Sequence, residues 1–163
     1  MSVAFVKEPN EDQVEVLPDR ELGSDPNLVT PRGLELIDRE IAALEKQLEE
    51  ARAAADKLAI ATINRDLRYW QARHATAEVV VPPDSVATVH FGSRVAIERE
   101  DGRRQLFQIV GIDEADPAEG LISYISPLAR SLIGKEVGDV VKAGASDAEI
   151  VEILPDSAEA ALS

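Results

Sequence analysis

The feature that most constrains the fold of this chain is a pair of apolar repeats in its first half. Apolar residues of the first repeat alternate between steps of three and four positions: Leu34, Ile37, Ile41, Leu44, Leu48, Ala51, Ala55 and Leu58. A second repeat alternates in the same way through Ile60, Ile63, Leu67, Trp70, His74 and Ala77. This spacing is typical of helices that pack along a coiled-coil seam. It predicts two long amphipathic helices.

The step between the two repeats favours a reversal of the chain. Leu58 and Ile60 are two positions apart, so the repeats are out of phase. One continuous helix would wind its apolar stripe around the axis, whereas a bend near residues 54–57 lets the two stripes face each other. We therefore predict an antiparallel hairpin over residues 31–80, with arms of about 22–24 residues and roughly 35 Å at ~1.5 Å per residue. No glycine or proline marks the bend, and a continuous helix is the alternative.

The ends of the predicted helices carry recognisable signals. Thr30 and Pro31 are an N-cap and a first helical position for the first arm. Asp56 can cap the second arm, and Pro82-Pro83 would stop it.

Beyond the prolines the pattern changes to that of β-strands. β-Branched, partly alternating segments predict strands at 86–91, 94–100, 106–112, 121–125, 137–141 and 148–154. Asp101-Gly102 is typical of a hairpin turn, and residues 127–133 read as a short helix that Ser126 caps and Gly134 ends. The predicted class is α+β: a coiled-coil hairpin over 30–81, then a β-rich domain over 85–154. Residues 1–29 are expected to form a mobile acidic tail, and residues 155–163 a frayed end.

Charge and composition exclude several classes. Most of the net charge of −14 lies in the first 30 residues and the last 85, and none of the ranges 1–30, 31–78 and 79–163 is basic, which argues against direct nucleic-acid binding. No apolar run reaches the ~20 residues of a membrane span, and the N-terminus lacks the pattern of a secretory signal. The chain has no cysteine, which excludes disulfides and thiolate metal sites. We expect a cytoplasmic monomer that contacts no membrane.

Few residues suggest chemistry of their own. His74 is interpreted as a partly buried histidine with a satisfied hydrogen bond, and His90 has no nucleophile pattern near it. The run Asp113-Glu114-Ala115-Asp116 lacks the spacing of a calcium loop and is interpreted as a solvated turn. Glycine-rich phosphate loops are absent from the sequence.

The acids near the expected hairpin tip are Glu49, Glu50 and Asp56. A hairpin tipped with paired carboxylates could carry a divalent metal into another protein's active site. The favoured interpretation is that they are ordinary surface acids beside Arg52 and Lys57.

Residues 91–140 resemble the C-terminal domain of the Gre transcription elongation factors, GreA and GreB. The resemblance is carried, in order, by Phe91-Gly92, Ile109-Val110-Gly111, the acidic turn at 113–116, and Ser126-Pro127-Leu128-Ala129-Arg130 leading into Leu132-Ile133-Gly134-Lys135. Thr30-Pro31-Arg32-Gly33 before a heptad helix is similar to the family's N-terminal opening. The resemblance covers residues 30–154 and implies an FKBP-like β domain behind a coiled-coil hairpin.

The resemblance also implies a partner, bacterial RNA polymerase. In the family the C-terminal domain grips the rim of the polymerase's secondary channel, and two acidic tip residues help to hold a catalytic magnesium for transcript cleavage. Nucleic acid is contacted only through the polymerase complex. By motif position, the implied polymerase contacts are Ser126, Pro127, Ala129 and Arg130.

The chain departs from the family at the hairpin tip. The signature Gly-Asp-Leu-x-Glu-Asn-Ala-Glu-Tyr has no match: Asp66-Leu67 shares two of its letters but lies between Arg65 and Arg68. The hairpin is also shorter by roughly two turns per arm, on the order of 12 Å. In both respects it is similar to the Rnk branch, which has lost the cleavage apparatus.

Three functional hypotheses follow. The first is a polymerase-binding elongation regulator that is not an enzyme and holds no cofactor. The second is a cleavage factor in which Glu49, Glu50 or Asp56 shares Mg²⁺ with the polymerase. The third, a prolyl isomerase or chaperone, rests on the FKBP-like fold alone, and fold does not imply function.

Overall fold

The computed structural model describes residues 16–81 and 86–155, which form two compact units. In its described part, one unit contains residues 16–24 and 38–75. The other contains residues 25–37, 76–81 and 86–155. After a two-residue strand at Leu28–Val29, two long helices precede a five-stranded sheet, so the α+β class is confirmed.

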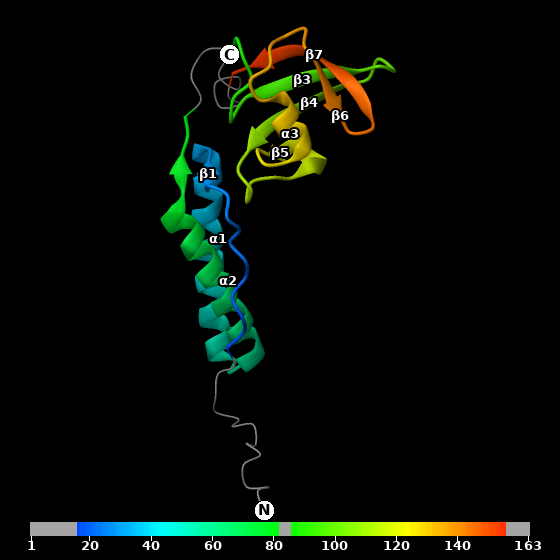
Figure 1. The fold of residues 1–163 in the computed structure, drawn as a ribbon. Helices are drawn as coiled ribbons and strands as arrows, with labels where there is room; N and C mark the ends of the chain where they lie inside the picture. Colours follow the sequence, from blue (N-terminus) through cyan, green and yellow to red (C-terminus); the bar gives the residue numbers. More distant parts are fainter. Residues whose placement is uncertain (1–15, 82–85, 156–163) are drawn as a thin grey trace, which may run out of the picture. The chain divides into compact units, whose positions relative to one another are not determined.

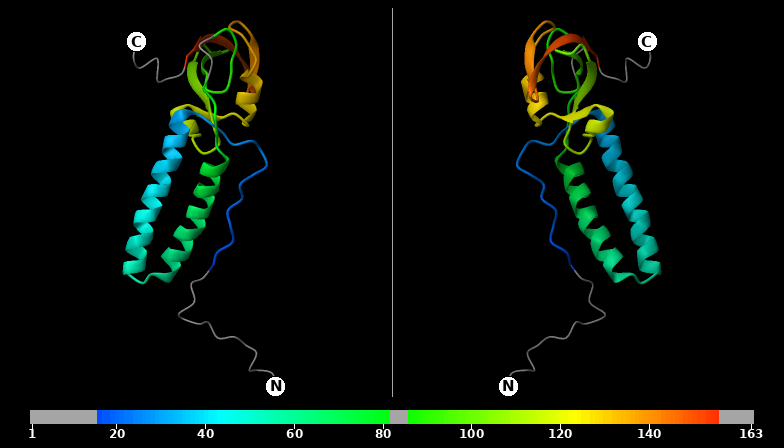
Figure 2. Two further views of the ribbon diagram at one scale, coloured as in Figure 1. Left: turned by 90° about the vertical axis from the view of Figure 1, so that its left-hand side faces the viewer. Right: turned by 90° about the vertical axis from the view of Figure 1, so that its right-hand side faces the viewer.

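Two helices form the predicted hairpin, α1 (Pro31–Ala53) and α2 (Lys57–Thr76), and they run side by side in opposite directions (Figures 1 and 2). Both predicted caps are present: Gly33 N donates to Thr30 Oγ1 at 2.9 Å, and Ala59 N donates to Asp56 Oδ1 at 3.1 Å. The bend lies where the phase shift of the repeats placed it. Ala55 makes the reversal in the left-handed region, at φ 52°. A non-glycine residue rarely adopts this conformation, and for this reason no local sequence signal marked the bend.

The helices pack through a short apolar seam. Its buried members are Leu48, Ala51, Ile63 and Leu67, with Ile41, Leu44, Ala59 and Ile60 partly buried against them. Leu58 was expected to continue the first seam, but its exposed fraction is 64%. It lies after the bend, in the first turn of α2, where the phase of the first helix no longer applies.

The second helix ends earlier than expected. It stops at Thr76, and residues 78–79 form β2 (Glu78–Val79), which pairs in parallel with β1 (Leu28–Val29). The prolines expected to end the helix lie outside the described residues. The expectation of a mobile tail also does not describe residues 28–29, since they form a strand. Residues 1–15 of the expected tail and residues 156–163 of the expected frayed end lie outside the described residues.

A five-stranded sheet dominates the β unit, in the order β5-β4-β3-β7-β6. The strands are β3 (Arg94–Arg99), β4 (Arg104–Val110), β5 (Leu121–Ser123), β6 (Val140–Ala143) and β7 (Ser146–Leu154). Neighbours are antiparallel except β4 and β5, which are parallel. A short 3₁₀ turn, η2 (Pro117–Glu119), leads into β5.

The turn between β3 and β4 is the predicted Asp101-Gly102 reversal, with Gly102 at φ 86°. A hydrogen bond from the Arg103 backbone N–H holds the pKa of the Asp101 carboxyl below its usual value.

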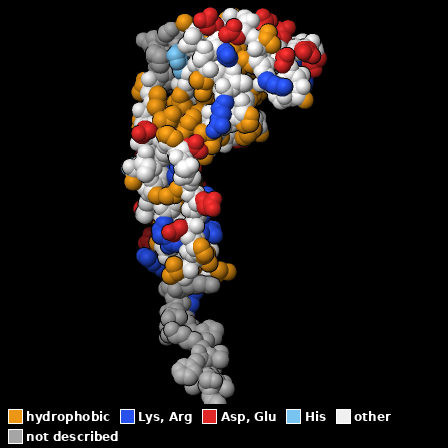
Figure 3. Space-filling model, in the orientation of Figure 1, with side chains coloured by type: hydrophobic (Ala, Val, Ile, Leu, Met, Phe, Trp, Pro, Cys, Tyr) orange, Lys and Arg blue, Asp and Glu red, His pale blue; other side chains and the backbone are white. Residues whose placement is uncertain are grey.

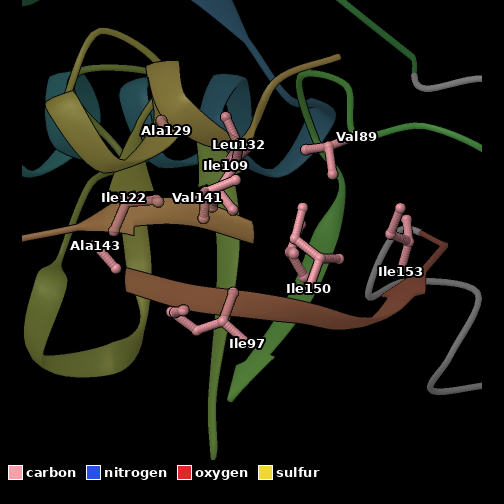
Figure 4. Close-up of a cluster of buried hydrophobic side chains, with 12 residues drawn as sticks. Val89, Ile97, Ile109, Ile122, Ala129, Leu132, Val141, Ala143, Ile150 and Ile153 are labelled. Carbon is pink, nitrogen blue, oxygen red and sulfur yellow. The ribbon is translucent and has the colours of Figure 1, made fainter. Parts of the chain in front are cut away.

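The short helix α3 (Pro127–Leu132) and the sheet enclose one apolar core (Figure 4). Ala129 and Leu132 of α3 pack against buried strand residues that include Ile97, Ile109 and Ile150. The strand expected at 86–91 is absent: Val89 is buried in this core, but its backbone pairs with the loop at Gly134 and Lys135. The predicted strand at 137–141 is displaced to 140–143 because residues 136–139 form a turn, closed by Asp139 N donating to Glu136 O.

Among the described residues, no helix combines the length and apolar character needed to cross a lipid bilayer.

Candidate functional site

The Ser-Pro-Leu-Ala-Arg motif builds the start of α3. Ser126 is the N-cap, and its Oγ accepts a hydrogen bond from Ala129 N at 3.2 Å. Pro127 occupies the first helical position, where it loses no intrahelical hydrogen bond, and it is exposed. Arg130 is also exposed, one turn further along the same face. These residues give α3 a fixed start and a solvent-facing proline and arginine.

Ala129 does not belong to that exposed surface. It was expected to contact a partner, but its exposed fraction is 0% and it packs in the β-unit core. Pro127 and Arg130 lie on the solvent-facing side of this short helix. Ala129 is two positions after Pro127 and one before Arg130, so it lies on the opposite side and faces the sheet. Ala129 can therefore only support the surface from beneath.

Sequence reasoning missed one apolar residue of this surface. Ile133 follows α3 directly and is 40% exposed, although it was read as an ordinary residue of the short helix. The spacing of three from Pro127 to Arg130 and on to Ile133 was a signal that could have found it. We refer to Pro127, Arg130 and Ile133 as the α3 surface.

The hairpin tip offers little to a metal ion. Glu49 and Glu50 are exposed in the last turns of α1, with Arg52 close by in sequence. Asp56 uses one carboxylate oxygen to cap α2, where the positive end of the helix dipole favours an anion. Within residues 16–81 and 86–155, no group of three or more His, Asp or Glu side chains is placed to hold a metal.

The His74 side chain is half-exposed, with Nε2 3.1 Å from Asp38 Oδ1. His90 lies 3.3 Å, ring nitrogen to hydroxyl, from Thr88.

Glu114 is the largest departure from the sequence-based expectation. It was interpreted as part of a solvated turn, but its side chain is 2% exposed and accepts a hydrogen bond from Thr30 Oγ1 at 2.6 Å. Arg32 Nη1 lies 3.6 Å from the other carboxylate oxygen. Burying a carboxylate without hydrogen-bond or ionic partners is costly in free energy, and these contacts offset that cost for Glu114. Glu114 thus fastens the residue that caps α1 to the loop after β4.

Two glycines permit the same region to pack closely. A Cβ on Gly33 would lie 2.8 Å from Glu114 Oε1, and one on Gly111 would lie 2.3 Å from the backbone oxygen of Leu28. In the same region Tyr124 Oη donates to the backbone oxygen of Pro26. Residues 26–33 are therefore held against the β4–β5 connection within one compact unit.

A family described as "Transcription elongation factor, GreA/GreB, C-term" matches residues 83–155. The chain is 34% identical over 134 residues to the transcription elongation factor GreB of Yersinia pestis, covering 71% of this chain and 78% of that one. It is 39% identical over 102 residues to GreB of Pasteurella multocida (strain Pm70), covering 62% of this chain and 65% of the relative. It is 46% identical over 95 residues to GreB of Neisseria meningitidis serogroup B, of which it spans 58%.

Solved structures are similar at lower identity. GreA factor homolog 1 of Thermus thermophilus is 22% identical, with 80% of this chain and 99% of that chain covered and a TM-score of 0.40. A transcription elongation factor GreA/GreB from Nitrosomonas europaea is 20% identical, with 78% and 98% covered and a TM-score of 0.40.

Proposed function

This chain belongs to the GreA/GreB family of transcription elongation factors, and on that premise we propose that it docks on bacterial RNA polymerase at the secondary channel without stimulating transcript cleavage. In this proposal it acts in the cytoplasm as a monomeric regulator that is not itself an enzyme and carries no cofactor. It contacts nucleic acid only through the polymerase complex.

The observation that carries the docking half of the proposal is the α3 surface. Pro127, Arg130 and Ile133 are exposed, while Ala129 and Leu132 of the same short segment are fully buried in the sheet's core. A rigid backing lowers the entropy cost of binding, because the side chains that meet the partner are already ordered. An exposed proline, an aliphatic residue and an arginine suit an interface with an apolar centre and a polar rim.

The absence of cleavage is proposed from the hairpin tip. The bend residues 53–55 are all alanine, and the nearest acids are interspersed with Arg52 and Lys57. Asp56 already caps a helix, and Glu49 and Glu50 are sequence neighbours about 100° apart on α1, so they cannot readily share one ion. Metal–oxygen distances of about 2.0–2.6 Å leave little tolerance for such an arrangement.

The docking test compares core-polymerase affinities of matched surface variants. Pro127→Glu should weaken binding by about 1–3 kcal/mol if the proline is a packed anchor, and it should leave the thermal midpoint nearly unchanged. Leu106→Glu is the matched control, since Leu106 is an exposed apolar residue of the same unit, on β4. Equal affinity of wild type and Pro127→Glu would remove the α3 surface from the interface.

The cleavage test uses a backtracked elongation complex with labelled RNA. We expect no magnesium-dependent shortening of the RNA by this protein alone, and a concentration-dependent loss of cleavage when it competes with an active cleavage factor. The alternative function, active cleavage through Glu49, Glu50 or Asp56 and a shared Mg²⁺, predicts shortening that Glu49→Ala or Asp56→Ser abolishes. Asp56→Ser keeps a side-chain oxygen for the helix cap while removing the carboxylate, so it separates loss of a ligand from loss of the hairpin's fold.

A further inference from the structure

Residues 17–22 lie in an extended conformation along α2 within the hairpin unit (Figure 2). Arg68 donates through Nε to Asp19 Oδ1 at 2.5 Å and through Nη2 to the backbone oxygen of Leu17 at 2.9 Å. Arg73 Nη1 donates to the backbone oxygen of Leu22 at 3.3 Å. We call residues 17–22 the strap.

A second set of contacts fixes the strap's register. The Arg20 guanidinium carbon lies 3.9 Å from the centroid of the Tyr69 ring, a cation–π geometry. The same guanidinium pairs with Asp66 at 3.4 Å. The α2 face therefore recognises two neighbouring side chains, an aspartate followed by an arginine, as well as two backbone carbonyls. Shifting the strap by one residue would place Arg20 against Arg68.

The two kinds of contact differ in how firmly they hold. Arg73 is 3% exposed, and a buried guanidinium requires hydrogen-bond acceptors of the kind that Leu22 supplies. In contrast, Asp19 is 74% exposed and its partner Arg68 is 40% exposed, so water and salt screen this pair. Figure 3 shows Lys, Arg, Asp and Glu side chains interspersed over the hairpin. Pairs that water and salt screen in this way hold the strap less firmly than the buried Arg73 contact does.

Charge along the chain favours docking of the strap's own segment. Residues 1–24 contain two basic and six acidic side chains, whereas residues 57–76 contain four lysines and arginines against one aspartate. Opposite net charges on two segments of one chain raise the docked population, and the tether adds an effective concentration in the millimolar range.

We propose that the strap is a displaceable cover over a peptide-binding face of α2 formed by Asp66, Arg68, Tyr69 and Arg73. The outside ligand that this face accepts is an extended polypeptide segment with an aspartate directly followed by an arginine. Such a segment makes the strap's contacts and therefore displaces it. The inference concerns the isolated chain, so it stands or falls independently of polymerase docking.

The test is competition on the full-length protein. The ¹⁵N-labelled chain is titrated with an unlabelled peptide of residues 15–24, up to about 10 mM, several times the effective concentration of a short tether. Amide signals of residues 17 and 19–22 should move towards their undocked positions, while those of β7 stay unchanged. The same peptide with Asp19→Arg is the control and should compete at least tenfold more weakly. Strap signals that do not respond to the wild-type peptide would show a permanent part of the fold and overturn the proposal.

A charge swap provides a second, independent readout. Arg68→Asp in the full chain should release the strap, and adding Asp19→Arg should restore docking. Trp70 is the only tryptophan and its ring lies 5.1 Å from that of Tyr69, so its fluorescence should follow the same changes. Failure of the double variant to re-dock the strap would contradict the assigned register. Docking that strengthens with protein concentration would mean exchange between two copies and would contradict a cover formed within one chain.

Discussion

The hairpin and the β unit differ in how many apolar side chains they bury. The β unit encloses a cluster of twelve buried apolar side chains, and Ile97, Ile109 and Ile150 within it have no exposed surface. The hairpin's buried cluster has four, and each of them keeps 6–9% exposure. Two helices can cover only one stripe of each other, whereas a curled sheet and α3 enclose a core from several directions.

Because of this difference, contacts outside the apolar cores matter more to the stability of the hairpin than to that of the β unit. Because its seam is thin, the hairpin depends on its ends: the Thr30 cap, the Asp56 cap and the bend at Ala55. Caps contribute about 0.5–2 kcal/mol each, a large share of what a short seam supplies. The apolar core of the β unit is large enough to stabilise that unit without contributions from surface residues such as Pro127.

The largest predicted effect contrasts the two cores directly. Ile97→Ala should lower the free energy of unfolding by about 3–4 kcal/mol, since it opens a cavity in a fully enclosed core. Leu67→Ala should cost about 2 kcal/mol, near the low end of the range, because its partly open site can fill with water or relax. Chemical denaturation of both variants measures the difference. Equal losses would show that the hairpin seam is as well enclosed as the sheet.

The next effect concerns Glu114, whose buried hydrogen bond joins Thr30, the cap of α1, to the loop after β4. Glu114→Ala should destabilise the chain by about 1–3 kcal/mol, since it removes the acceptor of the Thr30 hydroxyl and leaves a cavity. Glu114→Gln retains an acceptor oxygen and should cost less. Glu119→Ala, an exposed acid in the same loop, is the control and should change stability by less than about 0.5 kcal/mol.

If Glu114→Ala leaves the unfolding midpoint unchanged but Gly33→Ala lowers it, the region is held by close packing alone. A Gly33 Cβ would meet Glu114 Oε1 at 2.8 Å, so the double variant Gly33→Ala/Glu114→Ala tests the two together. A smaller loss in the double variant than in Gly33→Ala would locate the clash at the carboxylate.

Local patterns predicted most of the elements, and long-range contacts account for much of what the sequence did not reveal. The phase shift at Leu58–Ile60, the caps at Thr30, Asp56 and Ser126, and the Asp101-Gly102 turn each depend on residues a few positions apart, and each is confirmed. The Glu114–Thr30 hydrogen bond spans 84 positions and the Arg68–Asp19 pair 49. The spacing of apolar residues along the sequence does not indicate contacts between residues so far apart.

The strand predicted at residues 86–91 is absent for a related reason. Their β-branched composition favours a strand, but strand formation also needs a neighbour with free backbone groups, and Val89 pairs instead with the loop after α3. The candidate site was predicted in part. The exposed Pro127 and Arg130 follow from helix geometry once α3 is given, whereas the burial of Ala129 depends on which face meets the sheet.

The smallest predicted effect tests the dependence of the hairpin on its bend. Ala55 adopts φ 52°, a conformation that costs an L-residue with a Cβ about 1–2 kcal/mol. Ala55→Gly removes this cost but adds roughly 0.5–1 kcal/mol of backbone entropy to the unfolded chain. The net expectation is a gain of about 0.5 kcal/mol in the free energy of unfolding, measured by denaturation of the full chain. Ala53→Gly is the matched control: it lies in the last turn of α1, has no positive φ to relieve, and should lose stability instead. A loss in both variants would mean that the bend stores no strain at Ala55, and the hairpin would then depend on its caps and seam.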